Sequence, residues 1–275
     1  MTRRQRPGLG YASLVDVRSL GYRTDLAIRA LEGSQVSDRG EYLVIRTPAN
    51  PTYWWGNFLL LPAPPALGEP GRWLATFATE FPGAGHLTLG VDTGDAASTD
   101  AEAFAALGLE AELSSVLTAT APHAPPQPNP DAICRPLESD EDWRQSADLG
   151  TVMYAGTPGG DPEFVRARLA AARALTRAGH GWWFGAFTGG QLAAQLGVIR
   201  AGAGLARYQN VETHPDARRQ GLAGTLVWRA GEHALADGAR TLVIAADPAE
   251  GAIRVYRSVG FAQRETQIGF FRKPG

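Results

Sequence analysis

The second half of the chain alternates short apolar runs with glycine-rich turns and then changes to a helical pattern. Residues 182–187, 191–199 and 204–213 are β-compatible runs bounded by such turns, which predicts three successive strands. Residues 221–236 place apolar side chains close to every 3.6 positions and end at Gly238, which predicts a helix. The pattern is that of a mixed α/β domain.

Further elements flank this block on both sides. Asp161 and Pro162 supply an N-cap and a proline at the first helical position, so a long helix is expected to begin there. Downstream, the pattern predicts a buried strand over 241–246, a helix over 248–258 and a last strand over 263–271. Both hairpins and crossover connections are needed to join them.

The first half of the chain repeats the pattern of the second. Several blocks align in the same order and at nearly the same spacing: 57–62 with 210–215, Gly68 with Gly221, 83–92 with 238–247, and 104–113 with 256–265. Because such an ordered series is hard to obtain by chance, we infer two copies of one fold.

A proline-rich segment separates the two copies. Residues 119–131 contain five prolines and no apolar periodicity, which is typical of an extended, semi-rigid connector. We therefore predict a first domain over 1–124, a linker over 125–130 and a second domain over 131–275.

Composition narrows the class of protein. A chain of 275 residues with 44% apolar and 20% charged side chains can build the cores of two ordinary globular domains. No window approaches the ~18 consecutive apolar residues of a membrane span, and no secretory pattern follows the basic start. We expect a cytoplasmic protein that does not bind membranes.

Charge and cysteine content exclude further classes. A net charge of −2 gives little support for binding nucleic acid. The single cysteine, Cys134, has no partner for a disulfide and cannot build a multi-thiolate zinc site. We expect no metal, and interpret Cys134 as a buried structural thiol rather than a nucleophile.

Candidate chemistry lies between the third predicted strand and the helix after it. Residues 214–225 form a glycine-containing turn from strand to helix. Such a turn leaves several backbone N–H groups free, and the positive end of the helix dipole lies beside them. A pyrophosphate group is the expected ligand.

Two motifs resemble those of the GCN5-related N-acetyltransferases (GNAT). Arg218-x-x-Gly221-x-Ala223 resembles the family's acyl-CoA signature Q/R-x-x-G-x-G/A. A second segment resembles the family's later motif: Ala252-x-x-Val255-Tyr256-x-x-Val259-Gly260-Phe261. The resemblance covers residues 131–275. It implies two tandem GNAT-like domains, each with a mixed α/β sheet and together forming a pseudodimer, with acetyl-CoA as a substrate.

The resemblance also implies roles for individual residues. The expected coenzyme-binding residues are Val211, Thr213, Arg218, Arg219, Gln220, Gly221, Leu222, Ala223, Gly224 and Thr225. The Val211 amide is expected to polarise the thioester carbonyl. Thr225 either donates to a phosphate or caps the helix.

Two side chains are the expected catalysts. Tyr256 is expected to protonate the leaving thiolate, and Glu212 to act as general base, with Tyr208 and Asp247 as rivals. A solvated strand carboxylate is the alternative interpretation of Glu212. In one departure from the family pattern, Ala249 replaces an asparagine that contacts the pantetheine.

The first copy lacks the residues of this chemistry. Glu69-Pro70-Gly71 stands opposite Leu222-Ala223-Gly224, and Phe104 stands opposite Tyr256. A carboxylate repels diphosphate and proline has no amide proton. We expect this copy to bind no CoA and to serve structure or shape the acceptor site. Five aromatic residues either line an acceptor cleft or pack in the cores: Tyr53, Trp54, Trp55, Trp182 and Trp183.

The sequence predicts an acetyl-CoA-dependent N-acetyltransferase in which an amine attacks the thioester directly in a ternary complex. The acceptor is a small-molecule or peptide amine of unspecified identity. The alternative is an acyl-CoA-binding sensory module without turnover. We expect a monomer with an internal pseudodimer and no nucleic-acid partner.

Overall fold

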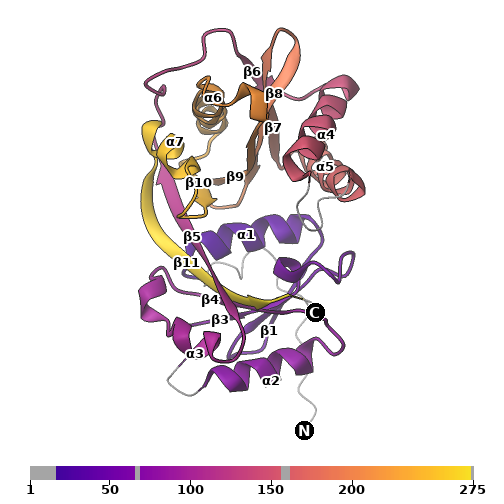
Figure 1. Cartoon of the computed structure of the whole chain (residues 1–275), viewed down its shortest axis with the longest axis vertical. Helices are drawn as coiled ribbons and strands as arrows, with labels where there is room; N and C mark the ends of the chain where they lie inside the picture. Colours follow the sequence, from indigo (N-terminus) through magenta and orange to yellow (C-terminus); the bar gives the residue numbers. More distant parts are fainter. Residues whose placement is uncertain (1–16, 66–68, 156–161, 274–275) are drawn as a thin grey trace. The chain divides into compact units, whose positions relative to one another are not determined.

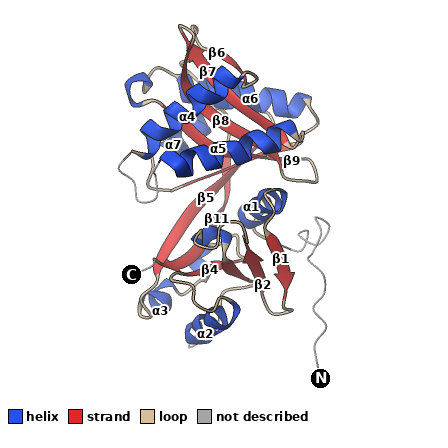
Figure 2. Ribbon diagram, turned by 90° about the vertical axis from the view of Figure 1, so that its right-hand side faces the viewer, coloured by secondary structure: helices blue, strands red, loops and turns tan. Residues whose placement is uncertain are grey.

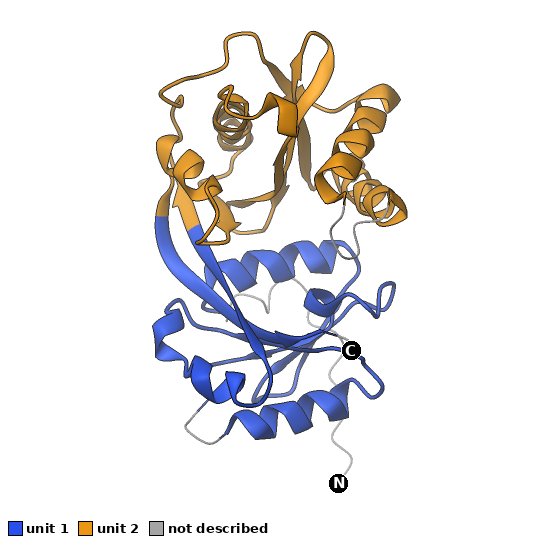
Figure 3. Ribbon diagram, in the orientation of Figure 1, with its two compact units in different colours: residues 1–116, 263–275 blue, residues 117–262 orange. Residues whose placement is uncertain are grey.

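The computed structural model describes residues 17–65, 69–155 and 162–273. The chain divides into two compact units, drawn in blue and orange in Figure 3. Unit 1 comprises residues 1–116 and 263–275, and unit 2 comprises residues 117–262.

Unit 1 contains the first copy of the repeat and the last strand of the chain. Its helices are α1 (Leu20–Leu31), α2 (Pro70–Glu80) and α3 (Ala101–Ala105), and its strands are β1 (Gln35–Asp38), β2 (Leu43–Arg46), β3 (Phe58–Leu61), β4 (Leu87–Val91), most of β5 (Glu110–Ala119) and most of β11 (Ala262–Arg272). Five strands lie in the order β1-β2-β3-β4-β11. Only β3 and β4 are parallel in this series.

The core of unit 1 covers both faces of this sheet. All four residues of β3 are buried, and successive side chains on a strand point to opposite faces. Leu59 packs in one cluster with Trp73 and Phe77 of α2. Phe58 packs in another cluster with Tyr22 of α1. The continuous apolar sequence of β3 follows from this two-sided burial.

Unit 2 contains the second copy. Its helices are α4 (Asp140–Tyr154), α5 (Pro162–Arg177), α6 (Leu222–Ala236) and α7 (Ala252–Ser258), and its strands are β6 (Ile133–Pro136), β7 (Gly181–Thr188), β8 (Gln191–Arg200), β9 (Leu205–Thr213) and β10 (Thr241–Ala246). The strands lie in the order β10-β9-β8-β7-β6. Neighbours are antiparallel except β9 and β10, which are parallel.

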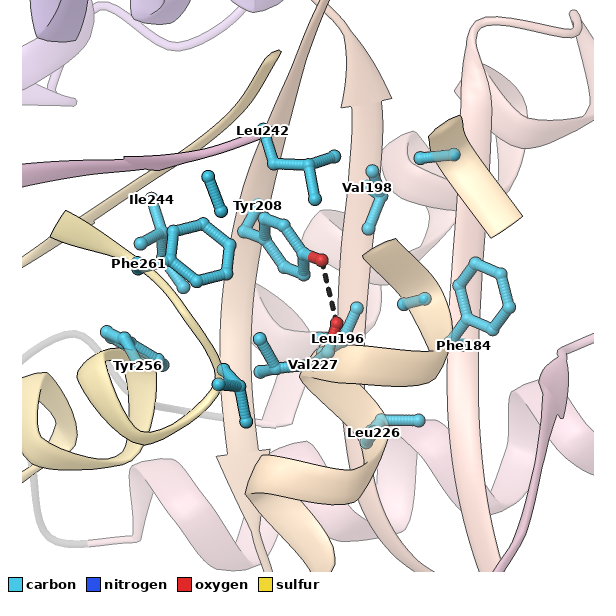
Figure 4. Packing of buried hydrophobic residues seen from close by; sticks show 14 of the residues in the cluster. Phe184, Leu196, Val198, Tyr208, Leu226, Val227, Leu242, Ile244, Tyr256 and Phe261 are labelled. Atoms are coloured by element: carbon cyan, nitrogen blue, oxygen red, sulfur yellow. Dashed lines mark hydrogen bonds between the residues drawn. The ribbon is translucent and has the colours of Figure 1, made fainter. Parts of the chain in front are cut away.

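Two hydrophobic clusters form the core of unit 2. In the larger one, Leu226 and Val227 of α6 pack against Leu196 of β8 and Tyr208 of β9 (Figure 4). The second cluster joins residues of α4 and α5, among them Val165, with residues of β7 and β8. Figure 2 shows α4 and α5 beside the strands of this unit. Helices therefore also pack against the sheet of unit 2.

The predicted repeat is confirmed by the order of elements. The series β3, α2, β4, α3, β5 in the first copy matches β9, α6, β10, α7, β11 in the second. In each series the first two strands are parallel to each other: β3 and β4 in the first copy, β9 and β10 in the second. The mixed α/β fold class is confirmed as well.

The structural units differ from the predicted ranges 1–124 and 131–275, because most of the last strand, β11, belongs to unit 1. β11 pairs antiparallel with β4, with Phe270 opposite Leu89. Phe270 is fully buried and stacks on Phe104, with 3.9 Å between the ring centroids. The C-terminal strand thus completes the sheet and the core of unit 1.

One predicted helix is shorter than expected. The segment predicted from residue 248 becomes helical only at Ala252. The Asp247 side chain accepts a hydrogen bond from the Ala249 amide at 2.7 Å, which forms a turn ahead of the helix. The predicted N-cap Asp161 and the aligned Gly68 lie outside the described residues.

Candidate active site

The parallel pair β9 and β10 opens toward its carboxyl end. The two strands pair from Leu205 to Arg207 on β9, where Arg207 faces Val243. β9 then continues to Thr213 and β10 to Ala246, beyond this paired stretch. The opening lies where the sequence analysis expects Val211 to Thr213.

A β-bulge turns the end of β9. Gln195 faces Glu212 and Gly197 faces Gln209, so Asn210 and Val211 together oppose a single residue of β8. Asn210 has φ of 49°, a left-handed conformation that asparagine tolerates better than most residues. A bulge redirects the side chains that follow it. Val211 and Thr213 line a cavity here.

The turn between β9 and α6 carries two residues with positive φ. Arg219 has φ of 61° and Gly221, the N-cap of α6, has φ of 76°. The amides in the first helical turn, Leu222 to Gly224, have no intrahelical acceptor. No group in the described parts of the chain accepts a hydrogen bond from them. These amides form a site suited to an anion such as a diphosphate.

A cavity of about 700 Å³ lies beside this turn. It is lined by residues of the connector, α4, β9, the turn, α6 and α7: Pro125, Pro126, Gln127, Met153, Val211, Thr213, Ala217, Arg218, Arg219, Gly221, Leu222, Ala223, Gly224, Glu250, Gly251, Ala252, Val255, Tyr256 and Ser258. Its volume lies within the ~300–1,000 Å³ typical of sites for small ligands.

Arg218 and Arg219 bring positive charge to this cavity. Both line it, and neither pairs with a carboxylate within the described ranges. A guanidinium group binds phosphate through parallel N–H donors. Together with the amides of α6, they fit the diphosphate or the 3′-phosphate of CoA.

Gln220 and Thr225 do not line the cavity. The Gln220 carbonyl accepts a hydrogen bond from Asn129 Nδ2 at 2.8 Å. Thr225 Oγ1 accepts from the Asn129 amide and donates to the Gly221 carbonyl, both at 2.9 Å. Of the two roles considered for Thr225, these contacts favour holding the start of the helix.

Tyr256 of α7 is one of the residues that line the cavity. The residue is 5% exposed, and its hydroxyl has no hydrogen-bond partner among the described groups. Burial, followed by the charge of Glu250, raises the pKa of this phenol above its ordinary value of 10. The group is therefore protonated at neutral pH, as a proton donor must be.

Glu212 is held in a buried hydrogen-bond network outside the cavity lining. Its Oε1 accepts from Arg168 Nη2 at 2.9 Å, and its Oε2 accepts from Gln195 Nε2 at 2.7 Å. Gln195 in turn accepts from the Ser146 hydroxyl and from the Trp183 indole. Both carboxylate oxygens of Glu212 are thus engaged, and its side chain does not line the cavity.

The two rival bases have other contacts. Tyr208 is 3% exposed and donates its hydroxyl to the Val227 carbonyl at 2.8 Å, drawn as a dashed line in Figure 4. Asp247 accepts from the Ala249 amide and is not among the residues lining the cavity.

Glu250 also lines the cavity, and no motif in the sequence marks it as a site residue. Among the described residues that line the cavity, only Glu250 has an acidic side chain. It lies two residues before α7, in an exposed turn. A glutamate in such a place is ordinary in sequence, so only its position beside the cavity distinguishes it.

Cys134 lies apart from this chemistry. It is a half-buried residue of β6 and does not line the cavity. Burial raises the pKa of its thiol to about 11, an effect that the nearby Arg229 reduces. A thiol that stays protonated is a poor nucleophile.

The first copy has different groups at the matching positions. Pro70 begins α2, so the first helical position has no amide proton, and Glu69 makes no capping hydrogen bond there. Phe104 has no hydroxyl and is 1% exposed in the core. The donors that define the turn of unit 2 are therefore missing at these positions.

The aromatic residues considered for an acceptor cleft pack within their own units. Trp54 packs against Phe271, and Trp55 donates to Glu112. Trp183 is 3% exposed. None of the five lines the cavity beside α6, whereas Trp182 and Trp183 line a second cavity of about 490 Å³ in unit 2.

Comparison with known families identifies the second unit. Residues 151–261 match the model of the acetyltransferase (GNAT) family. The chain therefore carries a GNAT domain, and that domain lies within unit 2. No curated protein matches the chain significantly.

Solved structures show the same fold over most of the chain. A GCN5-related N-acetyltransferase from Kribbella flavida has a TM-score of 0.65 at 16% identity, with 94% of this chain and 97% of that chain covered. A functionally unknown conserved protein from Staphylococcus epidermidis has a TM-score of 0.67 at 11% identity, with 87% and 93% covered.

A tandem GNAT protein from the clavulanic acid biosynthesis pathway is also similar. Its TM-score is 0.54 at 16% identity, with 98% of each chain covered. The fold of the whole chain is thus that of a tandem GNAT protein. None of the helices in the described parts of the chain is long and apolar enough to span a membrane.

Proposed function

We propose that this protein is an acetyl-CoA-dependent N-acetyltransferase whose single active site lies in unit 2. One observation carries the proposal. The free amides in the first turn of α6, the end of β9 beyond its pairing with β10, and Tyr256 all lie at one cavity. The GNAT match of residues 151–261 supports the same chemistry.

Different residues of the cavity bind different parts of CoA. The amides from Leu222 to Gly224 hold the diphosphate, with Arg218 or Arg219 beside it. The backbone of β9 around Val211 pairs with the pantetheine amides. The Val211 amide then polarises the thioester carbonyl, since a backbone donor stabilises the oxyanion of the tetrahedral intermediate.

The reaction transfers an acetyl group in one sequence of bond changes. The amine nitrogen attacks the thioester carbonyl carbon and forms the C–N bond. The intermediate collapses, the C–S bond breaks, and sulfur leaves with the bonding pair as a thiolate. A base takes the proton from nitrogen, and the Tyr256 hydroxyl donates a hydrogen bond to the departing sulfur.

The raised pKa of Tyr256 limits how this proton moves. A thiol resembling cysteine has a pKa of ~8.5, below that of the phenol, so complete transfer is uphill. Tyr256 therefore acts mainly by hydrogen bonding to the sulfur as negative charge develops. CoA leaves as a thiolate, and the proton that the base has removed from the amine passes to solvent.

Two carboxylates remain candidates for the base. Glu212 follows the bulge of β9 but has both oxygens engaged by Arg168 and Gln195. Glu250 lines the cavity that Tyr256 also lines. We propose that one of the two accepts the amine proton, directly or through water.

The first test is turnover with an amine panel. The full chain, acetyl-CoA and small-molecule or peptide amines are incubated, and free thiol is measured against a reaction without enzyme. Amine-dependent thiol release supports the transferase. CoA binding by calorimetry without release for any amine supports a sensory module instead, and absence of CoA binding overturns both.

A further inference from the structure

The proline-rich connector lies directly on the helices that form the cavity. The His123 amide donates to the Val259 carbonyl, just after α7, at 3.2 Å. Pro122 lies against Gly231 of α6, where an added Cβ would come within 3.1 Å of its ring. Figure 1 draws this segment as an extended loop between β5 and β6. The connector is thus a packed part of unit 2.

The connector touches α6 again at its first turn. A Cβ at Gly221 would lie 2.3 Å from the carbonyl oxygen of Gln127. A Cβ at Gly224 would lie 3.1 Å from Pro125. Distances under 3 Å do not occur for real Cβ atoms, so the first contact requires glycine. The absence of side chains at the two glycines of the anion site therefore allows the connector to pack against them.

Asn129 fastens the connector on both sides of Gly221. Its backbone amide donates to Thr225 Oγ1 at 2.9 Å, and its Nδ2 donates to the Gln220 carbonyl at 2.8 Å. Its Oδ1 accepts from the Asp131 amide at 3.0 Å, which fixes the side-chain orientation. One residue thus holds the residue before Gly221 and the helix that follows it.

The turn needs such support because its backbone is strained. Arg219 has φ of 61°, which is unfavourable for a residue with a Cβ. A conformation of this kind persists where surrounding contacts hold it. Asn129 Nδ2 donates to the carbonyl of Gln220, the residue that follows Arg219.

The connector leaves the cavity open. Pro125, Pro126 and Gln127 line the cavity, whose volume of about 700 Å³ is present with the connector in place. The connector therefore forms a wall of the cavity and does not fill it. The segment lies outside the residues that match the GNAT family model.

We propose that the connector is a component of the coenzyme site. Asn129 is a positioning residue that holds the turn in its anion-binding conformation, and Pro125 to Gln127 form a wall against which CoA binds. The inference rests on the proposed function only in naming CoA as the ligand.

The test is calorimetric titration of CoA into the full chain. Asn129→Ala removes the side-chain bonds to the Gln220 carbonyl and the Asp131 amide, and keeps the backbone bond to Thr225. Since a hydrogen bond contributes ~0.5–1.5 kcal/mol, we expect affinity to fall ~2-fold to 13-fold. Pro125→Ala removes part of the wall and is expected to weaken CoA as well. Pro128→Ala is the matched control, because Pro128 is exposed and does not line the cavity.

Kinetics separate positioning from catalysis. In the Asn129→Ala variant, KM for acetyl-CoA should rise while kcat stays near the original value. Unchanged CoA affinity in both Asn129→Ala and Pro125→Ala, with thermal unfolding as in the original chain, overturns the inference. Equal weakening by Pro128→Ala also overturns it. If the unaltered chain fails to bind CoA, the proposed function itself fails.

Discussion

Arg168 of α5 and Glu212 of β9 form an ion pair across the interior of unit 2, with 2.9 Å between Nη2 and Oε1. Arg168 also reaches the Asn210 side chain at 3.0 Å, so it holds both sides of the bulge that redirects β9. Through these contacts a helix outside the cavity lining positions the backbone on which the pantetheine is expected to lie.

Removal of this arginine should destabilise the chain strongly. Arg168→Met leaves Glu212, which is 6% exposed, without its cation. Breaking a buried pair in this way costs ~3–5 kcal/mol. Urea unfolding followed by tryptophan fluorescence measures the loss. Arg144→Met is the control, because its bridges to Glu141 and Asp148 are exposed and should be worth less than ~1 kcal/mol. Equal losses of unfolding free energy in the two variants would show that the buried ion pair stabilises the chain no more than the exposed ones.

The two candidate bases can be separated by the pH dependence of kcat/KM. If Glu250 accepts the amine proton, Glu250→Gln should lower kcat by ~10²-fold and remove the acid limb of the profile. Glu212→Gln should then keep that limb, and its effect should be mainly on stability. The reverse pattern assigns the base to Glu212.

One CoA per chain is expected, because only unit 2 has the donors of the anion site. Gly221→Pro should weaken CoA by tenfold or more, since proline fixes φ near −65° whereas Gly221 has φ of 76°. Gly71→Ala, at the matching turn of the first copy, should leave affinity unchanged because its Cβ would meet open space. Calorimetry that finds two equivalent sites would contradict the loss of binding in the first copy.

Local pattern was enough to predict most elements of unit 2. The runs from 182 to 213 are bounded by glycines, and the structure has strands there. The pairing of β11 with β4 was not predictable in this way. Apolar alternation indicates a strand, but it does not specify which strand it pairs with. The strand that follows α7 in sequence therefore completes the sheet of unit 1.

The candidate site was predictable only where a motif marks it. Gly221 and Tyr256 belong to motifs that resemble the family's, and both line the cavity. Asn129 lies 91 residues from Gln220 in sequence, and a lone asparagine among prolines carries no signal of that contact. Glu212 matched the expected position on the strand, but its bonds to Arg168 and Gln195 depend on the packing of α5 and β8.

Acid should destabilise unit 1 through Glu80. Hydrogen bonds from Arg39, with further ones from Arg46 and Tyr42, lower the pKa of Glu80 to about 2. A carboxylate whose pKa is lowered by folding stabilises the fold above its unfolded pKa of ~4.5, and this contribution is lost as pH falls toward 2. The lowered pKa corresponds to ~3 kcal/mol, and solvent screening reduces this value, so Glu80→Gln should remove roughly 2 kcal/mol at pH 7 and flatten the loss between pH 5 and 2.

The control for this experiment is Glu41→Gln, which removes a more exposed partner of Arg72. Urea unfolding at several pH values measures both variants. A Glu80→Gln chain that loses stability between pH 5 and 2 as steeply as the original would show that other groups dominate acid unfolding.

The hydroxyl of Tyr256 should be needed for turnover and not for binding. Tyr256→Phe keeps the ring that packs near Phe261 and removes only the hydroxyl of this cavity residue. We expect kcat to fall by roughly 10²-fold while CoA affinity changes little, measured where chemistry limits turnover. Because the pKa of this phenol is raised, the original enzyme should show no loss of activity from its ionisation up to pH 10. A variant with nearly unchanged kcat would leave Tyr256 the packing role that Phe104 has in the first copy.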